Sequence, residues 1–248
     1  MTTRESTGFL PRLDRTNAAG RRRSPGDWAA LLGFGAIQWP WLLRSLYGGR
    51  KADKNALLER LALPADALPH LGSWKADVGL LRLLVDHIER HRPRLVVEFG
   101  TGASTLILAR ALQRAGGGRL LSFDQHEEFV GATRQWLADY GLEAEIRAVP
   151  LLPGAAGWPG LWYDHGQLPG PIDLLVVDGP PWTVHPFTRG AAATLFGQMA
   201  VGGTIVLDDA ARPGERCIAR RWRRMWPNFE FRLWKGGTKG ALIGVRKS

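Results

Sequence analysis

Five carboxylates stand at the carboxyl ends of predicted strands, and they are the residues of this chain best placed to do chemistry. Glu98 lies in "RLVVEFG", Asp124 closes "LLSFD", Asp178 closes "IDLLVVD", and Asp208 and Asp209 close "GGTIVLDD". Packing of a hydrophobic core does not explain acids at these positions, because burying an unpaired carboxylate costs free energy. Ligands of parallel sheets bind at the carboxyl ends of the strands. The pattern therefore predicts a ligand site lined by these acids.

The stretch "EFGTGAST", residues 98–105, brings bare backbone next to the first acid. Gly100 and Gly102 match the start of a dinucleotide fingerprint, but Thr105 stands where its third glycine belongs. Glu98 would also oppose a pyrophosphate at the N-terminus of the following helix. A cationic or zwitterionic ligand without phosphate is therefore favoured. S-adenosylmethionine, which carries an ammonium and a sulfonium, meets that requirement.

We expect the cofactor to contact the first two strand ends. Glu98 would anchor the network around the ammonium, the glycines would let the backbone approach the methionine part, and Asp124 would bind the ribose hydroxyls. Dinucleotide-binding proteins use an acid in the same way, so Asp124 alone does not discriminate. The predicted cofactor contacts are Glu98, Gly100, Thr101, Gly102, Ser104, Thr105, Asp124, Gln125 and Asp178.

On the acceptor side, Asp178, Asp208 and Asp209 form a candidate metal site. Hard cations such as Mg²⁺ prefer oxygen ligands, and a bound ion would lower the pKa of an acceptor hydroxyl. The alternative is that Asp208 or Asp209 caps the next helix while the other is solvated. His185, seven residues after Asp178, is a candidate general base beside Asp178 itself. A solvated loop histidine is the alternative for His185.

Alternating strands and helices must position these residues. Apolar runs predict strands at 94–100, 119–124, 144–151, 172–179 and 202–209, and helical periodicity predicts helices at 76–91, 103–115, 127–141, 187–199 and 215–226. A loop rich in Pro, Gly and Trp covers 153–170. Two strands, 228–234 and 240–246, close the chain around a Gly-rich turn. We expect an α/β fold with a doubly wound, mostly parallel sheet and an antiparallel last strand.

From residue 74 to 246 the sequence resembles the class I S-adenosylmethionine-dependent methyltransferases. The motifs that carry the resemblance are "VVEFGTGAST", "LLSFD", "IDLLVVDGPP", "GGTIVLDD" and the terminal hairpin. It implies a Rossmann-like, seven-stranded sheet and cofactor contacts at Glu98, Gly100, Gly102 and Asp124. The three acids on the acceptor side are similar to those of metal-dependent O-methyltransferases that act on sugars and other small molecules, although "DGPP" departs from that pattern.

The stretch "DGPPW", residues 178–182, supports a second interpretation of the acceptor. It resembles the Asp-Pro-Pro-aromatic motif of methyltransferases that act on planar amines, although Gly179 shifts Trp182 out of register. Residues 212–248 hold eleven Lys or Arg against two Glu, which would suit nucleic acid. The simpler interpretation is that this positive charge reflects an arginine-rich composition and has no role in binding.

The first seventy-two residues carry a different composition. Residues 1–26 are polar and basic, which predicts a flexible arm, and residues 27–72 predict a helical extension before the methyltransferase domain at 73–248. Trp28 to Leu43 contain no charge, but Pro40 and two glycines make the segment a poor membrane span. The segment 28–50 is either a lid or dimer contact, or a membrane-interface segment.

Bulk properties agree with an enzyme of a reducing compartment. The chain has 248 residues, a net charge of +10 and one cysteine, Cys217, so an internal disulfide is excluded and a cytoplasmic protein is expected. We predict O-methylation of a hydroxyl on a small molecule or glycan. The alternatives are an N-methyltransferase acting on nucleic acid or protein, an NAD(P)-dependent oxidoreductase, and a non-catalytic membrane-peripheral module.

Overall fold

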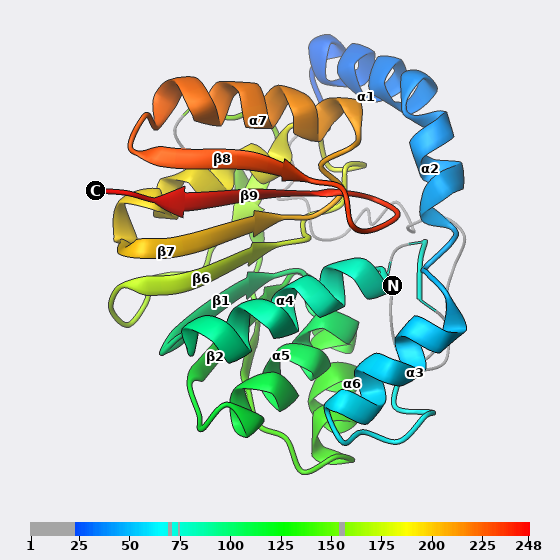
Figure 1. Ribbon diagram of the computed structural model, residues 1–248. Helices are drawn as coiled ribbons and strands as arrows, with labels where there is room; N and C mark the ends of the chain where they lie inside the picture. The colour runs from blue at the N-terminus through cyan, green and yellow to red at the C-terminus, as the bar shows by residue number, and fades with distance from the viewer. Residues whose placement is uncertain (1–22, 69–70, 74, 154–156) are drawn as a thin grey trace.

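A computed structural model describes residues 23–68, 71–73, 75–153 and 157–248. Its central element is a seven-stranded sheet in the order β3-β2-β1-β6-β7-β9-β8 (Figure 1). The first five strands in that order are parallel, and β9 is antiparallel to β7 and β8. The strands are β1 (Leu95–Phe99), β2 (Arg119–Asp124), β3 (Glu145–Ala148), β6 (Ile172–Val177), β7 (Met199–Leu207), β8 (Phe229–Trp234) and β9 (Ala241–Arg246). The predicted fold is confirmed.

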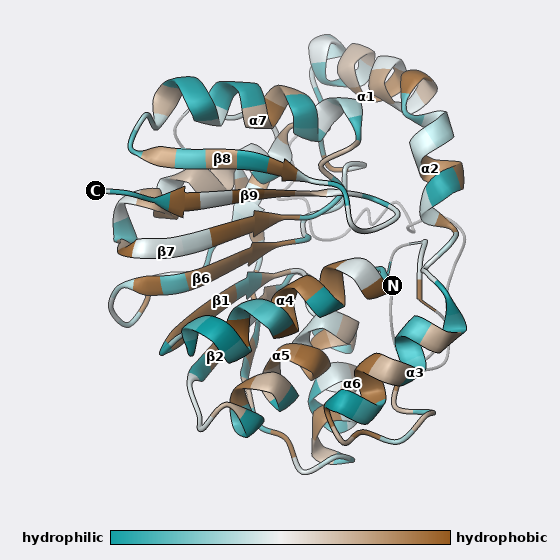
Figure 2. Ribbon diagram, viewed as in Figure 1, coloured by the Kyte–Doolittle hydropathy of each residue, from teal (hydrophilic) through white to brown (hydrophobic). Residues whose placement is uncertain are grey.

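Helices cover both faces of this sheet, and each face has its own hydrophobic core. On one face lie α4 (Val78–His91), α5 (Ala103–Arg114) and α6 (Glu127–Ala138). On the other lie the 3-10 helix η1 (Thr188–Gln198), α7 (Pro213–Met225) and a two-stranded sheet of β4 (Leu151–Pro153) and β5 (Leu161–Tyr163). The central strands are mainly brown in Figure 2, as expected for a sheet buried on both faces.

Helix α4 shows how the sequence pattern produces this packing. Asp77 caps its N-terminus, accepting a hydrogen bond from the Leu80 N–H at 2.7 Å. Leu81, Leu84 and Ile88 recur at helical spacing and are fully buried. The helix ends at Arg92, whose φ of 46° is left-handed, one residue before Pro93.

The strand order reverses between β1 and β6, so the chain leaves these two neighbouring strands toward opposite faces of the sheet. The carboxyl ends of β1, β2, β6 and β7 therefore meet at one edge, and the predicted acids lie there. Such a switch point is where open α/β sheets bind ligands.

Two predicted elements differ in detail. The expected strand 144–151 is split, because Pro150 has no N–H to donate to a neighbouring strand and the chain turns there. The second part, β4, pairs with β5, which lies in the expected loop 153–170. The expected helix 187–199 is the 3-10 helix η1. Gly190 of η1 lies against the Trp158 ring, which a Cβ would meet at 2.1 Å, so close packing governs this stretch.

The N-terminal extension consists of α1 (Pro25–Ile37), α2 (Trp39–Ser45) and α3 (Lys51–Arg60). A capping box between Ser24 and Asp27 starts α1, so the helix begins inside the predicted arm; residues 1–22 of that arm lie outside the described residues. Leu57, Leu58 and Leu61 belong to the same core as α4. None of the described helices is long and apolar enough to cross a membrane.

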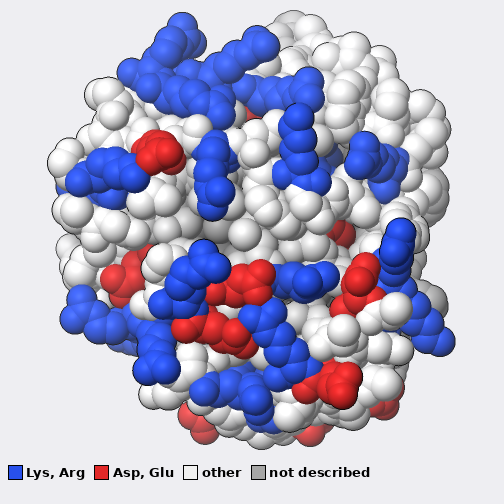
Figure 3. Space-filling view, viewed as in Figure 1, with Lys and Arg blue, Asp and Glu red and all other residues white. Residues whose placement is uncertain are grey.

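The basic excess of the C-terminal part lies mainly on one helix. Arg216, Arg220, Arg223 and Arg224 are exposed along the outer side of α7. Blue side chains gather at the top of Figure 3, where α7 lies in Figure 1. The only acid of α7 is Glu215, and it is buried.

Candidate active site

Glu98 is fully buried at the end of β1 and organises the glycine turn. Its Oε2 accepts hydrogen bonds from the hydroxyls of Thr105 and Ser122, both at 2.6 Å, while its Oε1 has no hydrogen-bond partner among the described residues. Burial raises the pKa of Glu98 from 4.5 to about 7, against the opposing effect of the neighbouring hydroxyls. The Gly102 N–H donates to Thr105 Oγ1 at 2.9 Å, which ties the acid to the turn.

The network continues to β2. Because Ser122 donates its proton to Glu98, Thr101 is the donor in the 3.0 Å bond between the Thr101 and Ser122 hydroxyls. The Asp124 carboxylate accepts from the Thr101 N–H at 3.2 Å and from the His126 N–H at 2.9 Å. Burial raises the pKa of Asp124, and the His126 N–H opposes this. The two acids thus lie at adjacent strand ends with fixed orientations.

Close backbone contacts explain the glycines that follow β1 and β6. Gly100 has a φ of 100°, and a Cβ there would lie 2.7 Å from the Gly179 nitrogen. A Cβ on Gly179 would lie 2.2 Å from the Tyr163 hydroxyl. That hydroxyl donates to Gln125 Oε1 at 3.0 Å. Gly179, an insertion relative to the Asp-Pro-Pro-aromatic motif, is therefore required by packing. Ser104, also a predicted cofactor contact, is buried in the first turn of α5.

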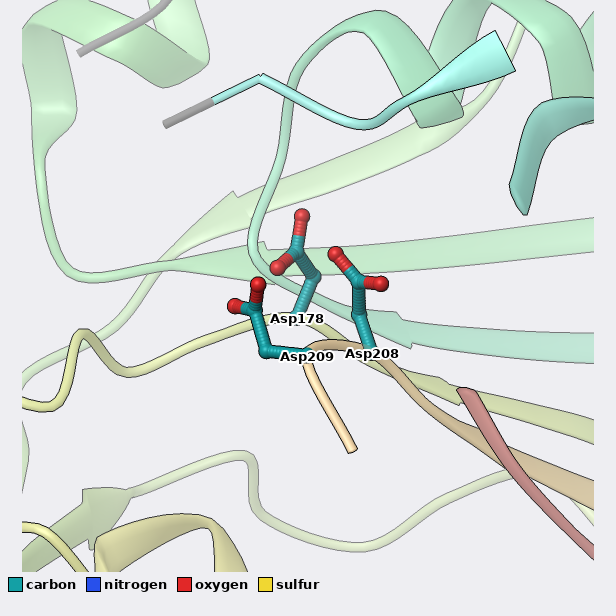
Figure 4. Close-up of side chains that lie close together, drawn as sticks. All are labelled: Asp178, Asp208 and Asp209. Atoms are coloured by element: carbon teal, nitrogen blue, oxygen red, sulfur yellow. The ribbon is translucent and has the colours of Figure 1, made fainter. Parts of the chain in front are cut away.

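Asp178, Asp208 and Asp209 come together as predicted. Asp178 follows β6, and the other two follow β7, which pairs with β6 (Figure 4). One oxygen from each lies within 4.8 Å of the others. Asp208 and Asp209 are buried, whereas the side chain of Asp178 keeps 14% of its exposure. The alternative for Asp208 and Asp209 is that one caps the next helix while the other is solvated. Both are buried, and the N-cap residue of α7 is Arg212.

Three basic side chains, Arg189, Arg212 and Lys239, are buried with these acids. Arg189 and Arg212 each place a terminal nitrogen 3.0 Å from Asp209 Oδ2, and Arg189 also donates to the Asp178 carbonyl oxygen. Lys239 Nζ lies 3.7 Å from Asp208 Oδ2 and 3.8 Å from Asp209 Oδ1, two oxygens without a hydrogen-bond partner among the described residues.

These contacts set the charge states of the cluster. Burial strongly opposes ionisation of Asp209, but Arg212, Lys239 and Arg189 together hold its pKa below its usual value. Burial and the charge of Asp209 raise the pKa of Asp208 well above its usual value. The nearby acids also raise the pKa of Lys239 against the effect of burial.

The β8–β9 turn delivers Lys239 to this position. Asp77 Oδ2 accepts hydrogen bonds from the N–H groups of Thr238 and Lys239 at 2.6 and 3.0 Å, while Asp77 Oδ1 caps α4. The ammonium of Lys239 also donates to the carbonyl of Lys75 at 2.8 Å. The lysine is thus fixed from several sides.

A divalent ion does not fit this arrangement. The two carboxylate oxygens that lack hydrogen bonds are the ones nearest the Lys239 ammonium, and the other oxygen of Asp209 faces two guanidinium groups. A metal would have to approach three buried cations and displace the lysine. The predicted meeting of the carboxylates is confirmed, but the chain's own cations neutralise them.

His185 and Trp182 lie beneath α1. His185 is buried; its Nδ1 accepts from the Phe187 N–H at 3.1 Å, and its Nε2 lies 3.8 Å from Asp27 Oδ1 of α1. Burial lowers the pKa of His185. The Trp182 ring packs against Gly35, where a Cβ would meet it at 3.5 Å. Both side chains therefore have packing roles, and catalysis by His185 remains a prediction that these contacts do not favour.

Comparisons with known proteins bear on this site. Residues 97–210 match a family model described as "Methyltransferase domain". This stretch, a little under half of the chain, is therefore similar to methyltransferase domains, and the strand order of the sheet is that of the Rossmann-like methyltransferase fold. No curated protein matches the sequence of the chain. The matched residues include Glu98, Asp124, Asp178, Asp208 and Asp209.

Solved structures share the methyltransferase fold at low sequence identity. A methyltransferase from Geobacter sulfurreducens is 20% identical over 79% of this chain and 88% of its own, with a TM-score of 0.53. An O-methyltransferase from Bacillus cereus in complex with S-adenosylhomocysteine is 19% identical over 88% and 100%, with a TM-score of 0.54. The O-methyltransferase TomG from Streptomyces achromogenes, in complex with S-adenosylmethionine, is 17% identical over 86% and 96%, with a TM-score of 0.50.

The sequence interpretation missed two residues of the candidate site, Arg189 and Lys239. Arg189 stands in the small, apolar run "TRGAAATLFG", where a buried guanidinium needs acidic partners. Lys239 belongs to the turn "KGGTKG", beyond the matched residues. The burial of Arg189 with acidic partners could have been predicted, because it is the one charged residue in an apolar stretch. Lys239 carried no such signal, because glycine-rich turns commonly hold a solvated lysine.

Proposed function

We propose that this methyltransferase transfers the methyl group of S-adenosylmethionine to a hydroxyl oxygen of a small molecule or glycan without a metal ion. The observation that carries the proposal is the pair of acids at adjacent strand ends. Glu98 keeps a buried oxygen without a hydrogen-bond partner in the described part of the chain, beside the turn in which Gly100 packs closely against Gly179. A carboxylate oxygen in that position suits the ammonium of the cofactor, and Asp124 suits the ribose hydroxyls.

Asp178 is our candidate for the general base. It is the most exposed carboxylate of the cluster, and it follows β6 directly beside the Gly100 turn. In the transfer, the acceptor oxygen would attack the methyl carbon while the carbon–sulfur bond breaks, and the sulfur keeps the bonding electrons. The acceptor proton would pass to the Asp178 carboxylate and then to solvent. Arg189, bound to the Asp178 carbonyl, would hold this residue in place.

Oxygen acceptors are favoured over amines on two grounds. The Bacillus cereus and Streptomyces achromogenes structures are both named O-methyltransferases. Trp182, the aromatic residue that would stack on a planar amine, instead packs against α1. We also propose that the enzyme works in the reducing cytoplasm, because its single cysteine, Cys217, suits a compartment without disulfides.

The test measures binding and transfer separately. Calorimetry on the full chain should show binding of S-adenosylhomocysteine and none of NAD. Methyl-labelled S-adenosylmethionine, incubated with matched panels of hydroxyl and amine acceptors, should label hydroxyls. Asp178→Asn should lower kcat by about a hundredfold or more and change the affinity for S-adenosylhomocysteine far less. Labelling of amines alone, or an unchanged kcat in Asp178→Asn, would overturn the proposal.

A further inference from the structure

The outward side of α1 and α2 is apolar and uncovered by the described residues. We call Trp28, Leu32, Ile37, Trp39, Leu43, Leu46 and Tyr47 the outer face; each is at least 42% exposed, and Leu32 is 68% exposed. Asp27 is the only charged residue of α1, and none of its residues is buried. A helix that is apolar all round is normally covered on every side.

The opposite side of α1 is held against the domain, which fixes the outer face in its outward orientation. Phe34 makes an edge contact with Phe187 at 4.9 Å between ring centroids, and Gly35 meets the Trp182 ring. Arg23, just before the helix, donates to the Thr183 carbonyl oxygen at 2.8 Å. Turning the outer face inward would break these contacts. Its apolar side chains therefore need a partner from outside the described chain.

A row of arginines on α7 begins next to α1 and α2. α1 packs next to α7, and the Arg216 guanidinium lies 5.9 Å from the centre of the Trp41 ring of α2. The arginine row comprises the exposed Arg216, Arg220, Arg223 and Arg224 of α7. Figure 3 shows blue side chains gathered at its top, where α7 lies in Figure 1. The single acid of α7, Glu215, is buried beside Arg189 and does not offset this charge at the surface.

We propose that the outer face and the arginine row together form a docking surface for an anionic phospholipid bilayer. Tryptophan and tyrosine favour the boundary between headgroups and acyl chains, and leucine and isoleucine would insert just below it. The arginines would meet phosphate and carboxylate groups of anionic lipids. Helices of 13 and 7 residues lie on a bilayer and do not cross it.

The charge of the surface favours lipid over a second copy of the chain. A second copy would present the same apolar and basic surface, and α7 carries no exposed acid with which the arginines of the other copy could pair. An anionic bilayer meets the apolar and the basic parts at once. The inference does not depend on the proposed methyl acceptor.

Vesicle flotation of the full chain tests the inference. The wild type should float with vesicles of phosphatidylcholine mixed with phosphatidylglycerol and remain at the bottom with phosphatidylcholine alone. Leu32→Glu with Trp39→Glu should lower binding at least about tenfold. Val201→Glu, at a side chain that is also 68% exposed but lies on β7, should bind like the wild type. Equal melting temperatures of these proteins would show that the changes do not unfold them.

The arginine row is tested with a charge-matched pair. Arg220→Glu with Arg223→Glu should lower binding to anionic vesicles at least about tenfold. Arg90→Glu with Arg114→Glu, which makes the same change in net charge at two exposed sites on α4 and α5, should leave it unchanged. Absence of wild-type binding, or equal loss in both pairs, would overturn the inference. Sedimentation that shows a wild-type dimer converted to monomer by Leu32→Glu with Trp39→Glu would assign the face to a second copy instead.

Discussion

Replacing Glu98 with glutamine removes the ionisable group of the glycine turn and keeps the size of the side chain. In the folded, cofactor-free protein the pKa of Glu98 is raised from 4.5 to about 7 by burial. The folded state therefore holds its proton to a higher pH than the unfolded chain does. Between those two values the folded state binds more protons, so stability falls as pH rises through this window and stays low above it.

The size of the effect follows from the shift. At ~1.4 kcal/mol per pKa unit, ionising Glu98 costs about 1 kcal/mol of stability at pH 5 and about 3 kcal/mol at pH 8. Glu98→Gln does not lose this stability, because glutamine does not ionise. Its amide oxygen can accept from Thr105 and Ser122, but its amide group stands without a partner where Oε1 was. That penalty is the same at every pH, so the informative quantity is the change with pH.

Urea unfolding of both proteins at pH 5 and pH 8 is the assay. The stability of Glu98→Gln relative to wild type should rise by about 2 kcal/mol between these pH values, or roughly 4–8 °C in melting temperature for a chain of this length. The difference isolates Glu98 from the other buried acids, which both proteins share. Affinity for S-adenosylhomocysteine should increase with pH through about 7 in the wild type and be weaker and flat in the variant. A stability difference that is constant across this range would refute the reasoning.

Three further predictions concern the neighbouring groups. Asp124→Asn places an amide group against one of two backbone N–H donors, from Thr101 and His126, and should weaken S-adenosylhomocysteine binding at least about tenfold by calorimetry. Lys239→Met leaves Asp208 and Asp209 without their ammonium and should cost about 3 kcal/mol in urea unfolding at neutral pH. The loss should be smaller at low pH, since Asp208 then carries a proton; a pH-independent loss would count against the ion pair. Dialysis against EDTA should change neither activity nor melting temperature, and recovery of lost activity by Mg²⁺ would restore the metal hypothesis.

The backbone arrangement was predictable because local signals agreed with one another. Continuous apolar runs ending in acid placed β1, β2, β6 and β7, and the geometry of parallel sheets then brought their ends together. The glycine turn could be read in the same way, since Gly100 needs a left-handed conformation and a neighbour without a side chain. The terminal hairpin followed from two short strands around a glycine-rich turn.

The partners of the acids were not predictable by such reasoning. Lys239 reaches Asp208 only because the hairpin returns between β7 and β8 and because Asp77, far away in sequence, binds its turn. Periodicity reports which side of an element is buried and not which distant side chain will meet it. The contacts of His185 were equally unpredictable: its loop packs beneath α1, with the ring 3.8 Å from Asp27, and its catalytic role stays a prediction. The lid interpretation of α1 agrees with these contacts.

The carboxylate of Asp77 joins two ends of the fold that a sequence alignment would treat as separable. One oxygen starts α4, and the other holds the turn that carries Lys239 to the acids. A graft of residues 97–210 of this chain into a relative would carry the five acids. It would leave Lys239 behind, so the recipient would have to supply a lysine of its own. Successful grafts should therefore transplant the stretch from Asp77 through the final strand as one block.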